Sequence, residues 1–272
     1  MALRKAGFCH SIIGCSRNES HLQQAKQLGV IDEYTTNPAE AVRDTDIIFL
    51  AVPLGAMQTV LCSIKDHLAS HTIITDGGSA KACVKQAAEA VFGELPPHFV
   101  PGHPIAGREK SGVNAAIDSL YQNRRVILTP TETTDCNALN TVIQMWQATG
   151  AKVEQLGIEE HDQVLAATSH LPHLLAFQLV STLAHSEVTE DIFKYAAGGF
   201  EDFSRIASSD PVMWRDICLQ NKTAILSMLD RFESGLSALK QYIEHEDGDK
   251  ILTIFQKAKA ARDRAIQAKQ QL

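Results

Sequence analysis

The chain has 272 residues, of which 44% are hydrophobic and 21% are charged, and its formal net charge is −7. This length and composition predict a soluble globular protein of two domains. Because basic residues are scattered among a majority of acidic ones, we expect no nucleic-acid partner. We also expect no membrane partner and a cytoplasmic location, since there is no uninterrupted apolar run of about 18 residues and no leader peptide. The six cysteines form no C-x-x-C pair, which fits a reducing compartment.

The first half of the sequence alternates short apolar runs with segments of helical period. The apolar runs are residues 11–14, 46–52, 72–75, 98–100 and 125–128. Runs that are apolar on both faces are typical of parallel strands covered by helices on both sides. Among the segments between them, we expect helices at 19–28, 38–43 and 56–68. The pattern predicts an α/β domain over residues 1–153, with a doubly wound parallel sheet.

From residue 154 onward, helix-forming residues dominate. We predict an all-helical second domain over residues 154–272, with helices at 159–185, 189–195, 209–244 and 250–271. One apolar stripe repeats at three- and four-residue steps and comprises Leu226, Leu229, Phe232, Leu236, Leu239 and Ile243. The stripe is typical of an intramolecular core or of a dimer seam, and the sequence leaves both interpretations open.

Three loops follow the carboxyl ends of predicted strands, where an open α/β sheet binds its ligand. They carry Val52-Pro53, Gly77-Gly78-Ser79-Ala80-Lys81 and Gly102-His103-Pro104. His103 is a candidate general base, because a histidine with its ordinary pKa near ~6.5 can accept a proton at neutral pH. Ser79 is either the cap of a helix that starts at Ala80 or a hydroxyl that orients His103 or a substrate oxygen.

Further candidates lie in the helical half. His170 and His173 are one helical turn apart and could share a face. A metal site there would need a third ligand from Glu159, Glu160 or Asp162, and we expect no metal. Arg205 precedes a predicted helix start at Ser209-Asp210-Pro211, where it could bind a carboxylate or form a surface ion pair.

Four segments follow one another along the chain: Thr75-Asp76-Gly77-Gly78-Ser79-Ala80-Lys81, Gly102-His103-Pro104-Ile105-Ala106-Gly107, Ser169-His170-Leu171-Pro172-His173 and Phe203-Ser204-Arg205-Ile206-Ala207. In order and spacing they resemble the prephenate dehydrogenase family, which includes arogenate and cyclohexadienyl dehydrogenases. The resemblance implies a Rossmann-like domain followed by a helical dimerisation domain, and hence a homodimer. It also implies NAD(P)-dependent oxidative decarboxylation of prephenate to 4-hydroxyphenylpyruvate, or of arogenate to tyrosine.

The resemblance also implies a role for each candidate residue. His103 accepts the proton of the substrate hydroxyl, and Ser79 holds the imidazole and that hydroxyl in line. Arg205 binds a substrate carboxylate. The remaining substrate-binding residues are His170, His173, Lys81 and Trp214.

The cofactor, NAD or NADP, is expected at the strand ends. The residues expected to contact it are Ser16, Arg17, Val52, Pro53 and Gly78. A hydroxyl and an arginine after the second strand of such a fold suit the extra phosphate of NADP, so Ser16 and Arg17 favour NADP or the use of both cofactors.

The sequence departs from the family at its start. It contains no G-x-G-x-x-G turn, and it begins in a predicted helix that ends at Gly7. The first strand is therefore expected to be missing, through a start codon assigned too late or a real truncation. Two other functions stay open: a non-catalytic homologue that acts as a dimeric binding module, and a β-hydroxyacid-type dehydrogenase, which typically uses a lysine base in its helical domain.

Overall fold

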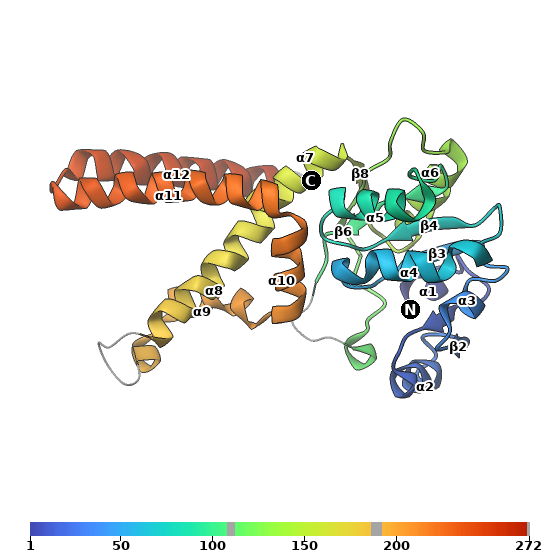
Figure 1. The fold of residues 1–272 in the computed structure, drawn as a ribbon. Coiled ribbons are helices and arrows are strands. Elements are labelled where there is room, and N and C mark those ends of the chain that lie inside the picture. Colours follow the sequence, from blue (N-terminus) through green and yellow to red (C-terminus); the bar gives the residue numbers. More distant parts are fainter. Residues whose placement is uncertain (108–111, 186–191, 271–272) are drawn as a thin grey trace. The chain divides into compact units, whose positions relative to one another are not determined.

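Strands and helices alternate through the first part of the chain (Figure 1). The computed structural model describes residues 1–107, 112–185 and 192–270. The elements up to residue 155 are α1 (Ala2–Lys5), β1 (Ile13–Cys15), α2 (Glu19–Gln27), β2 (Glu33–Thr35), α3 (Pro38–Ala41), β3 (Ile47–Leu50), α4 (Met57–Ile64), β4 (Ile73–Asp76), α5 (Ala82–Phe92), β5 (Phe99–Val100), β6 (Gly102–Pro104), β7 (Arg125–Leu128), α6 (Cys136–Ala148) and β8 (Lys152–Gln155). The five apolar runs all form strands. The sequence patterns missed β2, β6, β8 and α6.

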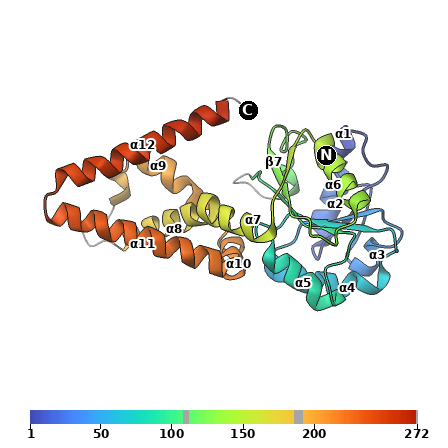
Figure 2. The ribbon, with the colours of Figure 1, turned by 90° about the horizontal axis from the view of Figure 1, so that it is seen from above.

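The strands pair in three short sheets, in the orders β1-β2, β3-β4-β5 and β6-β7-β8. Every pair is parallel except β6 with β7. Figure 2 shows α3, α4 and α5 on one side of the strands and α1 and α6 on the other. The prediction of a Rossmann-like sheet wound on both faces is therefore confirmed, with an antiparallel strand added.

The first two sheets are separate. Within the described ranges, neither β1 nor β3 pairs on its second edge. Ile13 on β1 and Phe49 on β3 are 43% and 40% exposed, which is high for apolar strand residues of this fold. This arrangement agrees with the expectation of a sheet that lacks the strand between them.

The main core joins the last sheet to α6. Its buried residues are Val100, Val126, Leu128, Ala138, Val142, Met145, Trp146 and Ala151. The Trp146 ring lies edge-on to Phe49 and Tyr121, with ring centroids 5.6 and 5.0 Å away. Such edge-to-face pairs add to the free energy gained by burial, so this cluster anchors β7, the partner of β6.

The second half of the chain is helical, as predicted. It contains α7 (Ile158–Leu165), a π-helical turn (Ala166–His170), α8 (Leu171–Ala184), α9 (Gly198–Ser204), α10 (Pro211–Gln220), α11 (Lys222–Glu244) and α12 (Gly248–Gln270). By contacts, Met1–Ile225 form one unit, and Leu226–Leu272 form a second. Part of the predicted helix 189–195, and the last residue of the predicted helix 250–271, lie outside the described residues. Ile192–Tyr195 form a 3₁₀ helix.

Two predicted helices are interrupted. The predicted helix 159–185 widens into the π turn just before Pro172. Proline has no N–H to donate to the carbonyl four residues earlier, so the regular ladder cannot pass through it. The predicted helix 209–244 breaks at the buried Asn221, between α10 and α11. Both breaks lie at the candidate site.

One helical run, Ile158–Ala184, is long and apolar enough by length and composition to cross a membrane. Polar residues interrupt this run, so it is not the uninterrupted apolar segment by which a membrane span was excluded from the sequence. The run contains His161, Asp162 and His170, which are buried and hydrogen-bonded to other elements of the same unit. Of the 18-residue window that meets this criterion, 28% is buried inside the structure.

Candidate active site

A buried ion pair fixes the loop after β4. The Asp76 carboxylate contacts the Lys81 ammonium, and both side chains are fully buried. Asp76 also accepts hydrogen bonds from the backbone amides of Gly78 at 2.8 Å and Gly102 at 3.0 Å. Lys81 Nζ donates to the Gly102 carbonyl at 2.7 Å. The residue next to His103 is thereby held by both members of the pair.

The antiparallel strand β6 presents His103. His103 pairs with Ile127 in the ladder between β6 and β7. A Cβ at Gly102 would lie 3.0 Å from Leu128 Cδ2 and 3.2 Å from the Asp76 carbonyl, so a side chain there would push the strand away. The glycine before His103 thus permits a close approach of β6 to the end of β4.

A second buried carboxylate comes from α7. Asp162 Oδ1 accepts from the Lys81 amide at 2.7 Å, and Oδ2 accepts from the Ala82 amide at 2.9 Å. These amides belong to the start of α5, where free N–H groups favour an anion. Burial by itself would raise the pKa of Asp162, but the hydrogen bonds from His161 and the two amides outweigh it and lower that pKa.

The prediction that Ser79 caps a helix starting at Ala80 is therefore wrong. The helix α5 begins at Ala82, and its first turn has no capping hydrogen bond from a side chain of its own N-cap residue, Lys81. The Asp162 carboxylate, from a helix 80 residues away in sequence, takes that place. Local sequence patterns cannot reveal such a cap.

His103 is held by another histidine. His103 Nδ1 lies 2.9 Å from His161 Nε2, and His161 Nδ1 lies 2.8 Å from Asp162 Oδ1. Within the part of the chain that the structure describes, no hydrogen bond reaches His103 Nε2 and none joins His103 to the Ser79 hydroxyl. The orienting group for His103 is thus His161, where the resemblance had implied Ser79.

Burial keeps these two imidazoles neutral. It lowers the pKa of His103 well below 6.5, and the positive charge of Lys81 and the neighbouring His161 and His170 act in the same direction. Burial also lowers the pKa of His161, although Asp162 favours its charged form. Both rings can therefore accept a proton at neutral pH.

His170 is 1% exposed and faces Asn221. Asn221 Nδ2 donates to the backbone carbonyl of Asp162 at 2.9 Å and lies 3.1 Å from His170 Nδ1. Burial lowers the pKa of His170 to about 4. Asn221, which the sequence patterns did not single out, connects the π turn to the backbone of Asp162.

The partly exposed His173 lies against the buried Trp214. Their rings are stacked, with centroids 3.8 Å apart, and the His170 ring lies 6.0 Å from the same indole. The two histidines thus share one face, as their spacing predicted. Burial lowers the pKa of His173, and the exposed Arg205 lowers it further, which places that guanidinium near the ring.

The predicted cofactor residues follow the carboxyl ends of three parallel strands. Ser16 and Arg17 are exposed beyond β1, Val52 and Pro53 follow β3, and Gly78 follows β4. A Cβ at Gly78 would lie 2.7 Å from Leu54 Cδ2 and 2.9 Å from Asp76 Oδ2. Gly78 is buried and packed closely against these side chains, whereas Ser16 and Arg17 offer exposed donor groups beyond β1, which fits a nucleotide lying along this edge.

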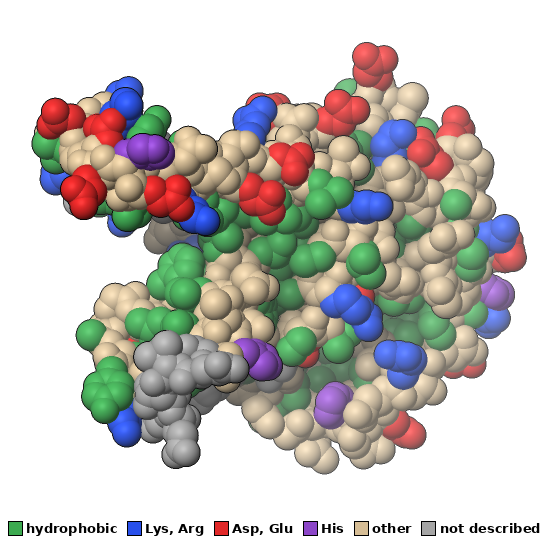
Figure 3. Space-filling view, turned by 60° about the vertical axis from the view of Figure 1, so that its left-hand side comes forward, with side chains coloured by type: hydrophobic (Ala, Val, Ile, Leu, Met, Phe, Trp, Pro, Cys, Tyr) green, Lys and Arg blue, Asp and Glu red, His purple; other side chains and the backbone are tan. Residues whose placement is uncertain are grey.

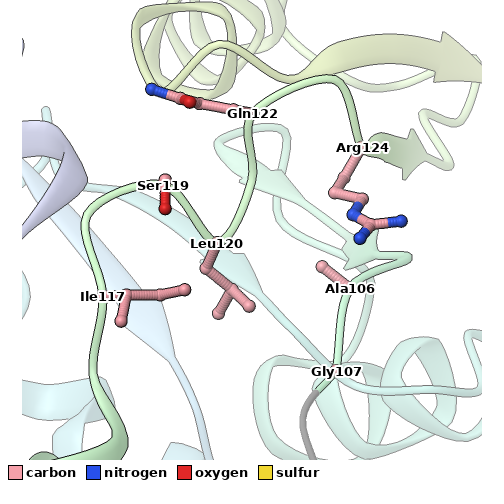
Figure 4. A pocket seen from close by; sticks show the side chains of 7 residues that line it. All are labelled: Ala106, Gly107, Ile117, Ser119, Leu120, Gln122 and Arg124. Atoms are coloured by element: carbon pink, nitrogen blue, oxygen red, sulfur yellow. The ribbon is translucent and has the colours of Figure 1, made fainter.

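Figure 4 shows a separate pocket of about 330 Å³, in which Ile117 and Leu120 face the side of Ala106 and Arg124. It contains none of the predicted site residues and is therefore distinct from the candidate active site. Within the described ranges, no group of three His, Cys, Asp or Glu side chains could hold a metal ion.

Figure 3 shows acidic and basic side chains interspersed over the face that it draws.

Comparison with known proteins identifies the family. Residues 1–155 match the prephenate dehydrogenase nucleotide-binding domain, and residues 158–257 match the prephenate dehydrogenase dimerization domain. This chain belongs to the prephenate dehydrogenase family.

Similar proteins agree with this assignment. The chain is 37% identical to the cyclohexadienyl dehydrogenase of Zymomonas mobilis over 90% of this chain and 84% of the relative. It is also 37% identical to the prephenate dehydrogenase of Bacillus subtilis, over 97% and 71%. The crystal structure of prephenate dehydrogenase from A. aeolicus with hydroxyphenyl propionate and NAD+ superposes with a TM-score of 0.89, at 40% identity over 96% of this chain and 91% of that one.

The Lys81 side chain does not lie where a substrate-binding residue was expected. The resemblance had implied contact with substrate, whereas the Lys81 side chain is fully buried against Asp76 and the Gly102 carbonyl. Its charge is compensated inside the protein and holds the His103 strand in position. His161 and Asp162 are the site residues that the sequence analysis missed in this role.

The lowered histidine pKa values predict acid sensitivity. In the unfolded chain a histidine binds a proton near pH ~6.5. In the folded protein the lowered pKa values of His103, His161 and His170 keep these side chains unprotonated at that pH. The free energy of unfolding is therefore highest above that pH and falls below it. Each such histidine lowers the free energy of unfolding by about 1.4 kcal/mol per pH unit, down to about pH 4 for His170. Urea unfolding at pH 7.5, 6.5 and 5.5 measures this slope.

The exposed His67 provides the control for that measurement. The variant His67→Gln should show the same slope as the wild-type protein. Asp162, whose pKa is lowered, loses its contribution only near and below pH ~3.9 and does not affect this range. A free energy of unfolding that stays constant from pH 7.5 to 5.5 would contradict the burial of neutral histidines.

Proposed function

We propose that this protein is an NAD(P)-dependent dehydrogenase of tyrosine biosynthesis. Its reaction is the oxidative decarboxylation of prephenate to 4-hydroxyphenylpyruvate, of arogenate to tyrosine, or of both. The observation that carries the proposal is His103, a partly buried imidazole with a lowered pKa at the carboxyl edge of the sheet, whose Nε2 engages no described residue. It lies in a chain that matches both domains of the family.

His103 acts as the general base. When bound, the oxidised nicotinamide supplies the acceptor for the hydride that leaves the ring carbon bearing the hydroxyl group. His103 Nε2 takes the proton of that hydroxyl as the carbonyl character of the carbon develops. Loss of the ring carboxylate as carbon dioxide then leaves its bonding electrons in the ring, which becomes aromatic as a phenolate. The protonated His103 returns its proton to that oxygen, which gives the phenol and restores the neutral imidazole.

The cluster around Trp214 holds the substrate. Arg205 is an exposed guanidinium near His173, and such a group binds a carboxylate with two hydrogen bonds. His173 is partly exposed and offers a flat surface to a six-membered ring, and the buried Trp214 is stacked against it. Ser79, partly buried in the same loop as Lys81, places a hydroxyl group where it can hydrogen-bond to the substrate oxygen.

Several other assignments belong to the same proposal. Ser16, Arg17, Val52, Pro53 and Gly78 hold the cofactor, and the domain boundary lies at residues 153–154. The protein is a cytoplasmic homodimer. The stripe on α11 supports this, because Leu226, Phe232, Leu236 and Ile243 are all exposed in the single chain and α11 lies within the matched dimerization domain.

A side-by-side assay tests the activity. Purified protein is offered prephenate, arogenate and 3-hydroxyisobutyrate with NAD+ or NADP+, and reduced nicotinamide is followed by absorbance. We expect turnover of prephenate, arogenate or both. Turnover of 3-hydroxyisobutyrate alone would replace the proposal by a β-hydroxyacid dehydrogenase. Dimers without nicotinamide binding would replace it by a non-catalytic binding module.

Two substitutions separate chemistry from binding. His103→Asn removes the base and should lower kcat by roughly 10²- to 10⁴-fold with little change in cofactor affinity. Arg205→Ala removes a carboxylate partner and should mainly raise KM. Steady-state kinetics with both substrates measures the two effects. Normal turnover by His103→Asn would show that the base lies elsewhere.

A third substitution tests cofactor preference. Arg17 is exposed after β1, where a guanidinium can pair with the extra phosphate of NADP. Arg17→Ala should therefore weaken NADP binding more than NAD binding, as measured by fluorescence titration. Arg43→Ala, which changes an exposed arginine after α3, is the control and should alter neither affinity. Equal losses for both cofactors on changing Arg17 would remove the assigned role.

A further inference from the structure

Three side chains form a chain of hydrogen bonds that starts at the first turn of α5. The Lys81 and Ala82 amides donate to Asp162, Asp162 contacts His161 Nδ1, and His161 Nε2 contacts His103 Nδ1. Every side chain in the series is buried or largely buried. The order of donors and acceptors along this series follows from the protonation state of its first side chain, Asp162.

Asp162 is the side chain whose protonation state is known. Its carboxylate, ionised because its pKa is lowered, can only accept hydrogen bonds, so His161 must carry its proton on Nδ1. A neutral His161 then has an unprotonated Nε2, which can only accept. His103 must consequently donate to it from Nδ1, and the remaining nitrogen, His103 Nε2, carries the free lone pair.

We propose that His161 and Asp162 are positioning residues that hold His103 in its Nδ1–H tautomer, so that Nε2 is the proton-accepting atom. The catalytic part of this inference rests on the proposed function. An isolated histidine side chain favours the opposite tautomer, with the proton on Nε2, in which that atom cannot act as a base. The relay thus selects the less common, reactive form before substrate arrives.

The charges around the relay determine how it responds when His103 becomes an imidazolium. Lys81, His161 and His170 face His103, and Lys81, Asp76 and Asp162 face His161. Lys81 is paired with Asp76, which leaves Asp162 as the carboxylate that the relay itself contacts. The Nδ1–H of the imidazolium stays directed at His161, whose other nitrogen is anchored to that carboxylate.

The tautomers can be measured directly in this protein. Nitrogen NMR of the chain labelled with ¹⁵N-histidine at pH 7.5 distinguishes protonated from unprotonated ring nitrogens, and His103→Asn assigns the His103 signals. We expect Nδ1–H with unprotonated Nε2 for both His103 and His161. The opposite tautomer at His103, or a charged His161, would overturn the proposal.

Two variants of His161 test its role. They differ in whether the new side chain can accept a hydrogen bond from His103. His161→Phe keeps a ring but removes the acceptor, so His103 should change to the Nε2–H tautomer. His161→Gln can offer its amide oxygen to His103 Nδ1 and should largely keep the wild-type tautomer. His67→Gln, at an exposed histidine, is the matched control and should leave the His103 signals unchanged. An unaltered His103 tautomer in a folded His161→Phe protein would refute the relay.

Kinetics provide the second readout. His161→Phe should lower kcat by roughly 10²- to 10⁴-fold while KM changes less than about threefold, since a wrong tautomer removes the base but leaves the binding groups in place. His161→Gln should recover most of that loss. Equal kcat values for the Phe and Gln variants, or an effect on KM alone, would make His161 a packing residue only.

The two proposals fail separately. If the wild-type protein oxidises neither prephenate nor arogenate, the proposed function is wrong, and the NMR measurement still decides the tautomer of His103. If the substrates are oxidised and the tautomers are as in free histidine, the function stands and the relay does not.

Discussion

The Asp162 carboxylate at the start of α5 is the contact on which the site depends. It satisfies two backbone amides that a helix start leaves without partners, and it does so from α7, far away in the sequence. The same carboxylate anchors His161, which in turn holds His103. One buried anion therefore joins the loop after β4, the helix that follows it and the strand carrying the candidate base. Because an unpaired buried charge is very unfavourable, none of these three parts can move away from the others without a large loss of stability.

The buried Asp76–Lys81 pair explains much of the first two sequence motifs. Burying two charges is favourable only when their remaining donors and acceptors are also satisfied. The amides of Gly78 and Gly102 and the Gly102 carbonyl provide those partners, and both glycines have neighbours too close for a side chain. Asp76, Lys81 and Gly102 are thus structural residues of the two motifs, and they hold the strand that carries His103. A motif can mark an active site without each of its polar residues touching the substrate.

The sequence predicted β1, β3, β4, β5 and β7 and the helical character of the second half, because burial on both faces and helical period leave direct marks in the order of residues. It did not predict β6, since Gly102-His103-Pro104 has no strand-forming residue and forms a strand only through its partner β7. His161 and Asp162 look in sequence like an ordinary acidic helix start after Glu159 and Glu160. Their role depends on partners 58 and 80 or more residues away, which no local pattern encodes. The π turn had a local signal in Pro172.

Burial gives His103 two properties that pull against each other. A pKa well below 6.5 keeps the resting imidazole unprotonated, but it also makes the imidazole a weak base. On the proposed function, the substrate itself reduces this conflict, because prephenate brings two carboxylates into the cluster around Arg205 and Trp214. Negative charge near an imidazole favours its protonated form, so the pKa of His103 in the complex should lie closer to neutral than in the free protein. The base is thus kept ready by the protein and strengthened by the molecule on which it acts.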